Sequence, residues 1–195
     1  MSARDISDSA AIVAAVTHWG LWRDTGRWDK LRALYTDDAI QHTTWFVGPA
    51  REFVERIAAR PLGGSQHFVG ACAVELQGDR AIAETRLVLL VRGKLQSTEV
   101  DVTCYCRSYD RFVRAADTWR IQRREMIYEK DRLDPVDPAA RIALEPAALA
   151  RYPAGYRHLA YLQAAGGARI TPDLPTPGSD ALGRLYAEGE YWLRA

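Results

Sequence analysis

The sequence contains little cysteine and no long apolar run. Only three of its 195 residues are cysteines, and none has a metal-type spacing to a histidine. Cys104 and Cys106 lie on one face of a predicted strand, where small buried thiols are common. No window approaches the roughly 20 apolar residues of a membrane helix. The first ten residues lack the basic-then-apolar pattern of a signal peptide, so we expect a cytoplasmic protein with no membrane partner.

An excess of one charge is also missing. The 26 basic and 25 acidic side chains leave a formal charge of +1 and are interspersed along the chain. A basic face for nucleic acid is therefore not indicated. The sequence has no glycine-rich phosphate loop, no set of metal ligands and no lysine placed for a Schiff base. We expect neither a metal nor a cofactor.

A long hairpin is the clearest pattern that is present. Apolar and polar residues alternate on both sides of Gly78-Asp79 between Gly63 and Gly93, which predicts two strands joined by a tight turn. His67 opens the first strand. Strict alternation would place His67 on one face with Val69, Ala71 and Ala73, and Phe68, Cys72, Val74 and Leu76 on the other.

Three helices are predicted before this hairpin. The first is expected to begin at Ser7 or Asp8 as its cap and to end at Asp24, with Gly26 as its C-terminal cap. A short second helix carries Trp28, Leu31, Leu34 and Tyr35 on its apolar side. The AIQHTTWFV segment, residues 39–47, is typical of one strand, and Pro49 is preorganised for the first position of a third helix.

Four long strands are predicted after the third helix, and the first two are those of the hairpin. Their ranges are residues 66–77, 80–92, 96–115 and 118–130. Three helices followed by a mainly antiparallel sheet indicate an α+β fold rather than an alternating one. In the last strand, Trp119, Ile121 and Ile127 are expected to alternate with Arg120, Gln122, Arg124 and Tyr128.

The composition changes after Asp131. Residues 132–195 hold seven of the nine prolines and five of the nine tyrosines. Helices are predicted in two pieces within residues 147–162, broken near Pro153, and in one piece over residues 181–193. This segment is too apolar for a disordered tail. We expect residues 1–131 to form the domain and residues 132–195 to pack on it as a lid or on a second subunit of a homo-oligomer.

Asp24 is the most informative polar residue. It falls in the last turn of its helix, where the helix dipole disfavours a carboxylate, one turn after Gly20, which lowers helix stability. Two residues that lower helix stability on the same side of the helix indicate that this side leaves space for another group. If this side packs over the strand that begins with His67, Asp24 can accept the imidazole Nδ1–H and leave the other nitrogen as a base. A solvated Asp24 that pairs with Arg23 or Arg27 is the competing interpretation.

Several landmarks together resemble the SnoaL-like (nuclear transport factor 2-like) superfamily. They are the helix ending in Asp24, then GRWDKLRALYTDDA, GPAREFVERI, SQHFVGACAVELQGDRAIAET and YDRFVRAADTWRIQRREMIY, over roughly residues 7–130. The resemblance is to the branch with scytalone dehydratase, dehydrochlorinase and formaldehyde-releasing lyases. It implies a cone-shaped barrel of a curved sheet on three helices. It also implies that Asp24 orients His67.

This sequence departs from that branch at two positions. Trp19 stands where the dehydrochlorinase has a lysine, which argues against chloride loss. Scytalone dehydratase uses a second histidine on a later strand, and none lies between His67 and His158 here. A different acid is needed, and the candidates are Arg124, Tyr105, Tyr109 and Tyr128.

The resemblance and the residues together predict acid–base elimination without a cofactor. His67, made more basic by Asp24, would remove a proton, and Arg124 or Tyr128 would stabilise the oxyanion or protonate the leaving group. Loss of water or formaldehyde from a hydrophobic aromatic molecule, such as a lignin-derived diaryl compound, fits this chemistry. Residues expected to line the substrate pocket are Trp22, Tyr35, His42, Trp45, Phe46 and Tyr105. The alternatives are a non-catalytic ligand-binding or structural subunit, or a polyketide cyclase or isomerase.

Overall fold

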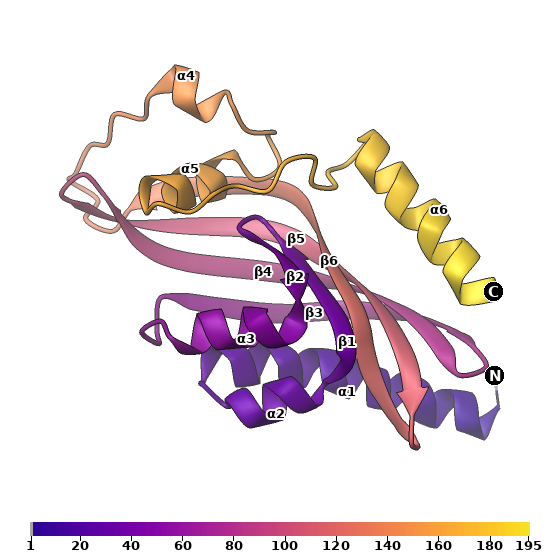
Figure 1. Cartoon of the computed structure of the whole chain (residues 1–195). Helices are drawn as coiled ribbons and strands as arrows, with labels where there is room; N and C mark the ends of the chain where they lie inside the picture. The colour runs from indigo at the N-terminus through magenta and orange to yellow at the C-terminus, as the bar shows by residue number, and fades with distance from the viewer. Residues whose placement is uncertain (1) are drawn as a thin grey trace.

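The computed structural model describes residues 2–195. Figure 1 shows six strands that form one curved sheet with helices packed around it. The helices are α1 (Ala3–Asp24), α2 (Trp28–Ala33), α3 (Ala50–Ala58), α4 (Pro146–Leu149), α5 (Arg157–Ala165) and α6 (Asp180–Arg194). The strands are β1 (Tyr35–Thr43), β2 (Phe46–Pro49), β3 (Ser65–Gln77), β4 (Arg80–Leu95), β5 (Thr98–Ala115) and β6 (Thr118–Pro135).

The sheet confirms the predicted α+β class. Its strand order is β2-β1-β6-β5-β4-β3. Every neighbouring pair is antiparallel except β1 and β6, which run parallel. The four long strands thus form an antiparallel meander, and the short β1–β2 hairpin extends it along β6. No helix in residues 2–195 is long and apolar enough to cross a membrane.

Helix α1 begins earlier than the sequence predicts. Ser2 is its cap and forms a capping box with Asp5, so the expected start at Ser7 or Asp8 is wrong. Asp8 instead accepts hydrogen bonds from Trp119 Nε1, at 3.1 Å, and from Arg114. The partners of Asp8 lie on β5 and β6, more than 100 residues away, so the local sequence could not predict this pairing. The C-terminal end is as expected, because Gly26 follows the last turn with φ +71°.

The segment predicted as one strand over residues 39–47 is a hairpin. Strand β1 ends at Thr43, Thr44 and Trp45 make the turn, and β2 returns antiparallel. The turn destroys the alternation that would have placed His42 on one face with Phe46. Pro49 is the residue before α3 rather than its first position.

Bulges correct the expected faces of β3 and β6. In β3, Gly70 and Ala71 together oppose Arg86, because Val69 pairs with Leu87 and Cys72 with Thr85. The extra residue brings Cys72, Val74 and Leu76 onto the face of His67 and turns Ala73 outward. In β6, the pairing shifts at Gln122 and again at Glu129. Arg124 and Tyr128 therefore face the same side as Trp119, and Ile127 faces away.

The concave face of the sheet is covered by two groups of helices. At one end, α1, α2 and α3 bury a core that includes Val16, Phe53 and Phe112. At the other end, α5 buries Leu159 and Ala160 against Val102 and Cys104 of β5. Helix α6 packs on the convex face over Ile82, Tyr109 and Ile127. The site described below lies where the two concave cores meet.

The segment after β6 braces the sheet. Tyr128 N–H donates to Pro175 O at 2.9 Å, and Thr171 N–H donates to Thr44 O at 2.8 Å. Gly155 lies so close to β6 that an added Cβ would be 2.4 Å from Tyr128 O. The predicted helices of this segment are present as α4, α5 and α6. Backbone contacts to both Thr44 and Tyr128 fix the position of two residues that line the cavity.

Candidate active site

Asp24 and His67 form a hydrogen-bonded pair. Asp24 Oδ1 lies 2.7 Å from His67 Nδ1, and Asp24 Oδ2 accepts the His67 backbone N–H at 2.6 Å. Both carboxylate oxygens therefore hold the same histidine. Because a carboxylate can only accept, the Nδ1 atom carries the proton of the neutral ring. No hydrogen bond involves Nε2 among the residues that the structure describes, so this atom is left as a base.

Gly20 allows this pair to form. A Cβ at this position would lie 2.8 Å from Val69 Cγ2 and 3.5 Å from His67 O. The missing side chain lets α1 approach the backbone of β3 and brings the last turn of the helix to the start of the strand. The sequence predicted that the side of α1 with Gly20 and Asp24 leaves space for another group. In the structure, β3 occupies this space.

The pKa of His67 is lowered to about 4. Burial is the main cause, since the side chain is 7 % exposed, and the positive charge of Arg23 adds to it. The hydrogen bond and charge of Asp24 act in the opposite direction but do not compensate. Asp24 does make His67 more basic, as expected, but burial and the positive charge of Arg23 outweigh this contribution. At neutral pH the imidazole is uncharged.

Burial also opposes the charged form of Asp24, but His67 outweighs it. The hydrogen bonds from His67 hold the pKa of the carboxyl below its ordinary value, and the charge of Arg23 contributes. Arg23 Nη1 lies 3.2 Å from Asp24 Oδ1 and donates to Ser65 Oγ at 2.7 Å. The competing interpretation, in which Asp24 pairs with Arg23, is thus also present in the structure. Asp24 serves both partners.

His67 lines the smaller of two neighbouring chambers. The inner chamber has a volume of about 40 Å³ and the outer chamber about 230 Å³. Arg23, Trp45, Leu89 and Gln163 line both chambers, so the two chambers lie side by side. The inner chamber is completed by Trp19, Gln41, Thr43, Thr44, Phe53, His67, Met126 and Tyr128. Asp24 lies in the wall of the outer chamber.

Tyr128 is the one predicted acid candidate that lines this cavity. Its hydroxyl oxygen accepts the Thr44 backbone N–H at 3.1 Å, and burial keeps the pKa of the phenol well above its ordinary value. The hydroxyl proton is therefore retained and can be donated to a ligand. The ring packs against Tyr156, with centroids 5.2 Å apart.

The other three acid candidates lie elsewhere. Arg124 is fully buried, forms two hydrogen bonds of 2.6 and 2.7 Å with Asp110, and stacks 4.1 Å above the Trp19 ring. It supports the inner wall from behind and does not line either chamber. Tyr105 lies exposed on the convex face, and Tyr109 packs there against Tyr186 of α6. A role for Tyr105 in substrate binding at this cavity is therefore contradicted.

Of the aromatic and histidine residues expected to bind substrate, only Trp45 lines the cavity. Trp22 stacks on His18 of the same helix, α1, and Lys30 of α2 lies over its ring. His42 points to the convex face and lies 3.2 Å from Glu125 Oε2. Phe46 is core and packs on Phe53. Tyr35 is also core, although its hydroxyl bonds to two residues of the inner wall, Trp19 and Gln41.

Two glutamines of the cavity wall escaped the sequence analysis. Gln41 lies on β1 beside His42 and is fully buried, and Gln163 comes from α5. Gln41 Nε2 and Gln163 Oε1 are buried atoms without a hydrogen-bond partner. A polar residue inside a predicted strand was the only available signal for Gln41. Nothing local marked Gln163, which belongs to the segment whose packing the sequence left open.

A second Asp–His pair lies outside the cavity. His158 Nδ1 is 2.8 Å from Asp131 Oδ1, and Asp131 Oδ2 accepts the Leu159 N–H at 2.8 Å. His158 lines neither chamber. Within residues 2–195, no group of three or more histidine, cysteine or acidic side chains is arranged to hold a metal ion.

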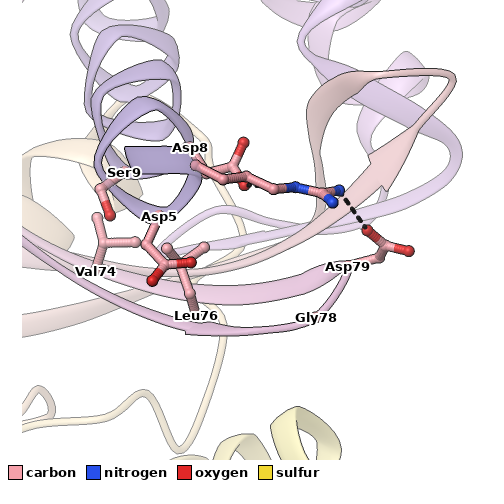
Figure 2. A pocket seen from close by; sticks show the side chains of 8 residues that line it. Asp5, Asp8, Ser9, Val74, Leu76, Gly78 and Asp79 are labelled. Carbon is pink, nitrogen blue, oxygen red and sulfur yellow. Dashed lines mark ion pairs between the residues drawn. The ribbon is translucent and has the colours of Figure 1, made fainter. Parts of the chain in front are cut away.

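A larger surface hollow lies far from both pairs. It measures about 600 Å³ and lies between the start of α1 and the β3–β4 turn. Figure 2 shows Asp5, Asp8 and Asp79 around it, with a dashed line for the ion pair of 3.9 Å between Arg4 and Asp79. Asp8 and Asp79 are paired with arginines, and Asp5 accepts the Ser2 backbone N–H. It offers a solvated, charged surface with no base facing an enclosed space.

Comparisons with known proteins agree with this architecture. A pea pathogenicity protein 2 from Fusarium vanettenii is 28 % identical over 190 residues, covering 90 % of this chain and 81 % of that protein. A PEP2-like protein of the same fungus is also 28 % identical, over 188 residues and with the same coverage.

Solved structures show the same fold. A proposed scytalone dehydratase from Novosphingobium aromaticivorans has a TM-score of 0.58 at 16 % identity, covering 73 % of this chain and all of that one. A hexachlorocyclohexane dehydrochlorinase, LinA type 2, has a TM-score of 0.56 at 14 % identity, covering 73 % of this chain and 95 % of that one. The family model of the SnoaL-like domain matches residues 4–125. The chain belongs to the SnoaL-like domain family, and the resemblance found in the sequence is confirmed.

Proposed function

We propose that the protein is a lyase that needs no cofactor and acts on a hydrophobic aromatic molecule by acid–base elimination. The observation that carries this proposal is the Asp24–His67 pair at the inner chamber, with Nε2 free of protein partners. A scaffold needs no buried imidazole that is oriented by a carboxylate and faces an empty space. The solved dehydratase and dehydrochlorinase structures with this fold make elimination the first reaction class to test.

His67 is the base in this proposal. Its Nε2 takes a proton from carbon or from a hydroxyl group, and Asp24 stabilises the imidazolium that forms, because the carboxylate keeps its negative charge 2.7 Å from Nδ1. The low pKa keeps the ring neutral, and therefore competent, at every pH above about 4. Such a ring is a weak base, so the proton it removes must be acidified by the substrate itself.

Tyr128 is the acid. In loss of water, the electron pair of the broken C–H bond forms a C=C bond while the C–O bond breaks, and the Tyr128 proton completes the leaving water. In loss of formaldehyde, His67 takes the proton of a hydroxymethyl group, the O–H electron pair forms the C=O bond of formaldehyde as the C–C bond breaks, and Tyr128 gives its proton to the carbon left behind. Both routes end with the imidazolium proton returning to the phenolate or to solvent. Neither route requires an oxidant or a reductant.

The cavity supports an aromatic substrate. The outer chamber is lined by Trp28, Trp45, Ile57, Leu62 and Leu89, and aromatic and aliphatic walls of this kind bind rings. The inner chamber of about 40 Å³ admits only a small group such as a hydroxyl or carbonyl. The ring therefore occupies the outer chamber and the reacting group the inner one. Residues 132–195 act as a wall of this site through Gln163.

The test is turnover of lignin-type diaryl and phenolic alcohols by purified protein, with formaldehyde and water loss followed separately. His67→Gln is expected to lower kcat/KM by about 10²- to 10⁴-fold, the usual contribution of a general base. Tyr128→Phe is expected to lower kcat more than it raises KM. His158→Gln is the matched control, because it changes an Asp-paired histidine outside the cavity.

Full activity of His67→Gln on a substrate that the wild type converts would contradict the proposal. The alternative, a non-catalytic ligand-binding subunit, predicts that panel compounds bind in the outer chamber without conversion. A polyketide cyclase or isomerase predicts a product of unchanged mass.

A further inference from the structure

A short relay of hydrogen bonds fixes the orientation of Gln41. Trp19 Nε1 lies 2.6 Å from the Tyr35 hydroxyl, which lies 2.7 Å from Gln41 Oε1. An indole nitrogen can only donate, so the Tyr35 oxygen accepts that bond and its own proton goes to Gln41. Burial raises the pKa of Tyr35 to about 12, which keeps this proton in place. Gln41 must therefore offer its carbonyl to Tyr35 and its NH₂ group to the other side.

That NH₂ group has no partner in the described chain. Gln41 is 0 % exposed, its Nε2 is buried without a hydrogen bond, and its side chain lines the inner chamber. Leaving a buried donor unpaired costs about 1–3 kcal/mol. The relay prevents the amide from turning to relieve this cost. An unpaired donor on a side chain that lines a small chamber is the arrangement expected of a site that awaits an acceptor.

We infer that Gln41 is the hydrogen-bond donor that recognises an acceptor oxygen of the substrate, and that the substrate is an aromatic compound carrying a carbonyl group. Gln41, whose Nε2 is unpaired, and Tyr128, whose hydroxyl oxygen accepts the Thr44 N–H, both line this chamber. A carbonyl oxygen has lone pairs and no proton, so it can accept from Gln41 Nε2 while the Tyr128 proton remains available for the leaving group. A hydroxyl group would bring an additional proton to be satisfied in this enclosed space.

This inference rests on the proposed function and makes it more specific. When His67 removes a proton from the carbon next to a carbonyl, negative charge moves to the carbonyl oxygen. A fixed N–H at that oxygen stabilises the charge as it develops. A weak base needs such assistance, because the carbonyl acidifies the neighbouring C–H bond. The leaving group then lies on the next carbon.

The experiment compares two ligands of matched shape, acetophenone and ethylbenzene, which differ in the carbonyl oxygen. Their dissociation constants are measured for the wild type, Gln41→Met and the control Gln77→Met. Gln77 is an exposed glutamine at the end of β3, so Gln77→Met repeats the chemical change outside the cavity. The infrared stretching frequency of ¹³C-labelled acetophenone is recorded in each complex. Circular dichroism and thermal unfolding establish that each variant is folded.

The wild type and Gln77→Met are expected to favour acetophenone, and Gln41→Met is expected to lose about tenfold of this preference. The downward shift of the carbonyl frequency on binding should shrink in the same variant. If Gln41→Met does not fold, Gln41→Glu replaces it, since a carboxylate keeps the bond from Tyr35 but offers no N–H to the ligand.

An unchanged preference in the folded Gln41 variant, or a wild type that binds acetophenone no better than ethylbenzene, would overturn the inference. Ligand binding is measured without turnover. Failure of the proposed lyase activity would therefore leave this result intact, and failure of the Gln41 assignment would leave the His67 test intact.

Discussion

The protein contains two Asp–His pairs with the same hydrogen-bond pattern and different surroundings. In each, one carboxylate oxygen holds Nδ1 of the histidine and the other accepts a backbone N–H. The His67 side chain is 7 % exposed and faces the inner chamber, whereas that of His158 is 24 % exposed and joins α5 to β6. The pattern alone is therefore a clamp between a helix and a strand.

What distinguishes the first pair is the space in front of it. His67 lines the same chamber as Tyr128 and as Gln41, whose Nε2 is unpaired. Asp131 and His158 connect two elements and have no such neighbours. A geometric search for Asp–His pairs would find both, and only the cavity separates a candidate base from a structural contact.

The largest expected difference between the two Asp–His pairs is the loss of catalytic activity when the aspartate is replaced by asparagine. Asp24→Asn leaves one acceptor oxygen for two donors, so the amide NH₂ group meets either Nδ1 or the backbone N–H. Meeting Nδ1 moves the ring proton to Nε2 and removes the base. We expect kcat/KM to fall by about 10²- to 10⁴-fold. Asp131→Asn makes the same change at the second pair and should keep activity within about twofold.

Steady-state kinetics of the two variants decide this point. Both substitutions weaken bonds to a carboxylate and should lower the free energy of unfolding by about 1–3 kcal/mol. Stability alone therefore cannot separate them. Equal losses of activity in the two variants would mean that the pairs are equivalent and that His67 has no special role.

The next difference concerns pH and stability. The pKa of His67 is about 4 in the folded protein and 6.5 in the unfolded chain. Between these values the unfolded chain binds a proton that the folded protein does not, so stability falls as the pH falls from 6.5 to 4. The total is about 3 kcal/mol. It should be absent from His67→Gln.

Urea unfolding at pH 7 and pH 4.5 measures this effect. The wild type should lose more stability than His67→Gln between the two pH values. The same series on His158→Gln shows what a paired histidine outside the cavity contributes. A loss of the same size in the wild type and in His67→Gln would contradict the assigned burial of this ring.

A smaller effect on stability tests the packing of Gly155 against Tyr128, a residue that lines the inner chamber beside His67. An added Cβ at Gly155 would meet Tyr128 O at 2.4 Å, so Gly155→Ala should lower the free energy of unfolding by about 1–3 kcal/mol. Gly183 in α6 has no atom within 4 Å of the same position. Gly183→Ala should raise stability by up to about 1 kcal/mol through helix propensity. Thermal unfolding of both variants should give shifts of opposite sign.

Local signals in the sequence offered the Asp24–His67 pair as one of two interpretations, and the resemblance to the SnoaL-like superfamily favoured it. An aspartate at the unfavourable end of a helix, a glycine one turn earlier and a histidine at the start of a strand can all be read without tertiary contacts. The mainly antiparallel sheet and the three helices followed from alternation and from helix patterns, whereas the curvature of the sheet was implied by the family resemblance. The low pKa of His67 could not be predicted, because it depends on burial by Trp19 and other residues distant in the sequence.

β-Bulges and contacts between residues distant in the sequence explain where the sequence predictions were wrong. A bulge adds one residue and inverts the alternation beyond it, as Gly70 and Ala71 do in β3 and Gln122 does in β6. The sequence predicted His42 as a residue of the substrate pocket. In the structure, Gln41 lines the inner chamber, and His42 faces the opposite side of the sheet. Gln41 acquires its meaning from Trp19 and Tyr35, and this relay exists only in the folded chain.

The most direct test of the central claim is the protonation of His67 itself, observed by ¹⁵N nuclear magnetic resonance of the imidazole nitrogens across pH 4–8, with His67→Gln used for assignment. The account predicts a neutral ring at pH 7 with the proton on Nδ1 and Nε2 unprotonated, and a ring that stays neutral until the pH approaches 4. A ring that titrates near 6.5, or one that carries its neutral proton on Nε2, would show that Asp24 and the cavity do not hold His67 as a base.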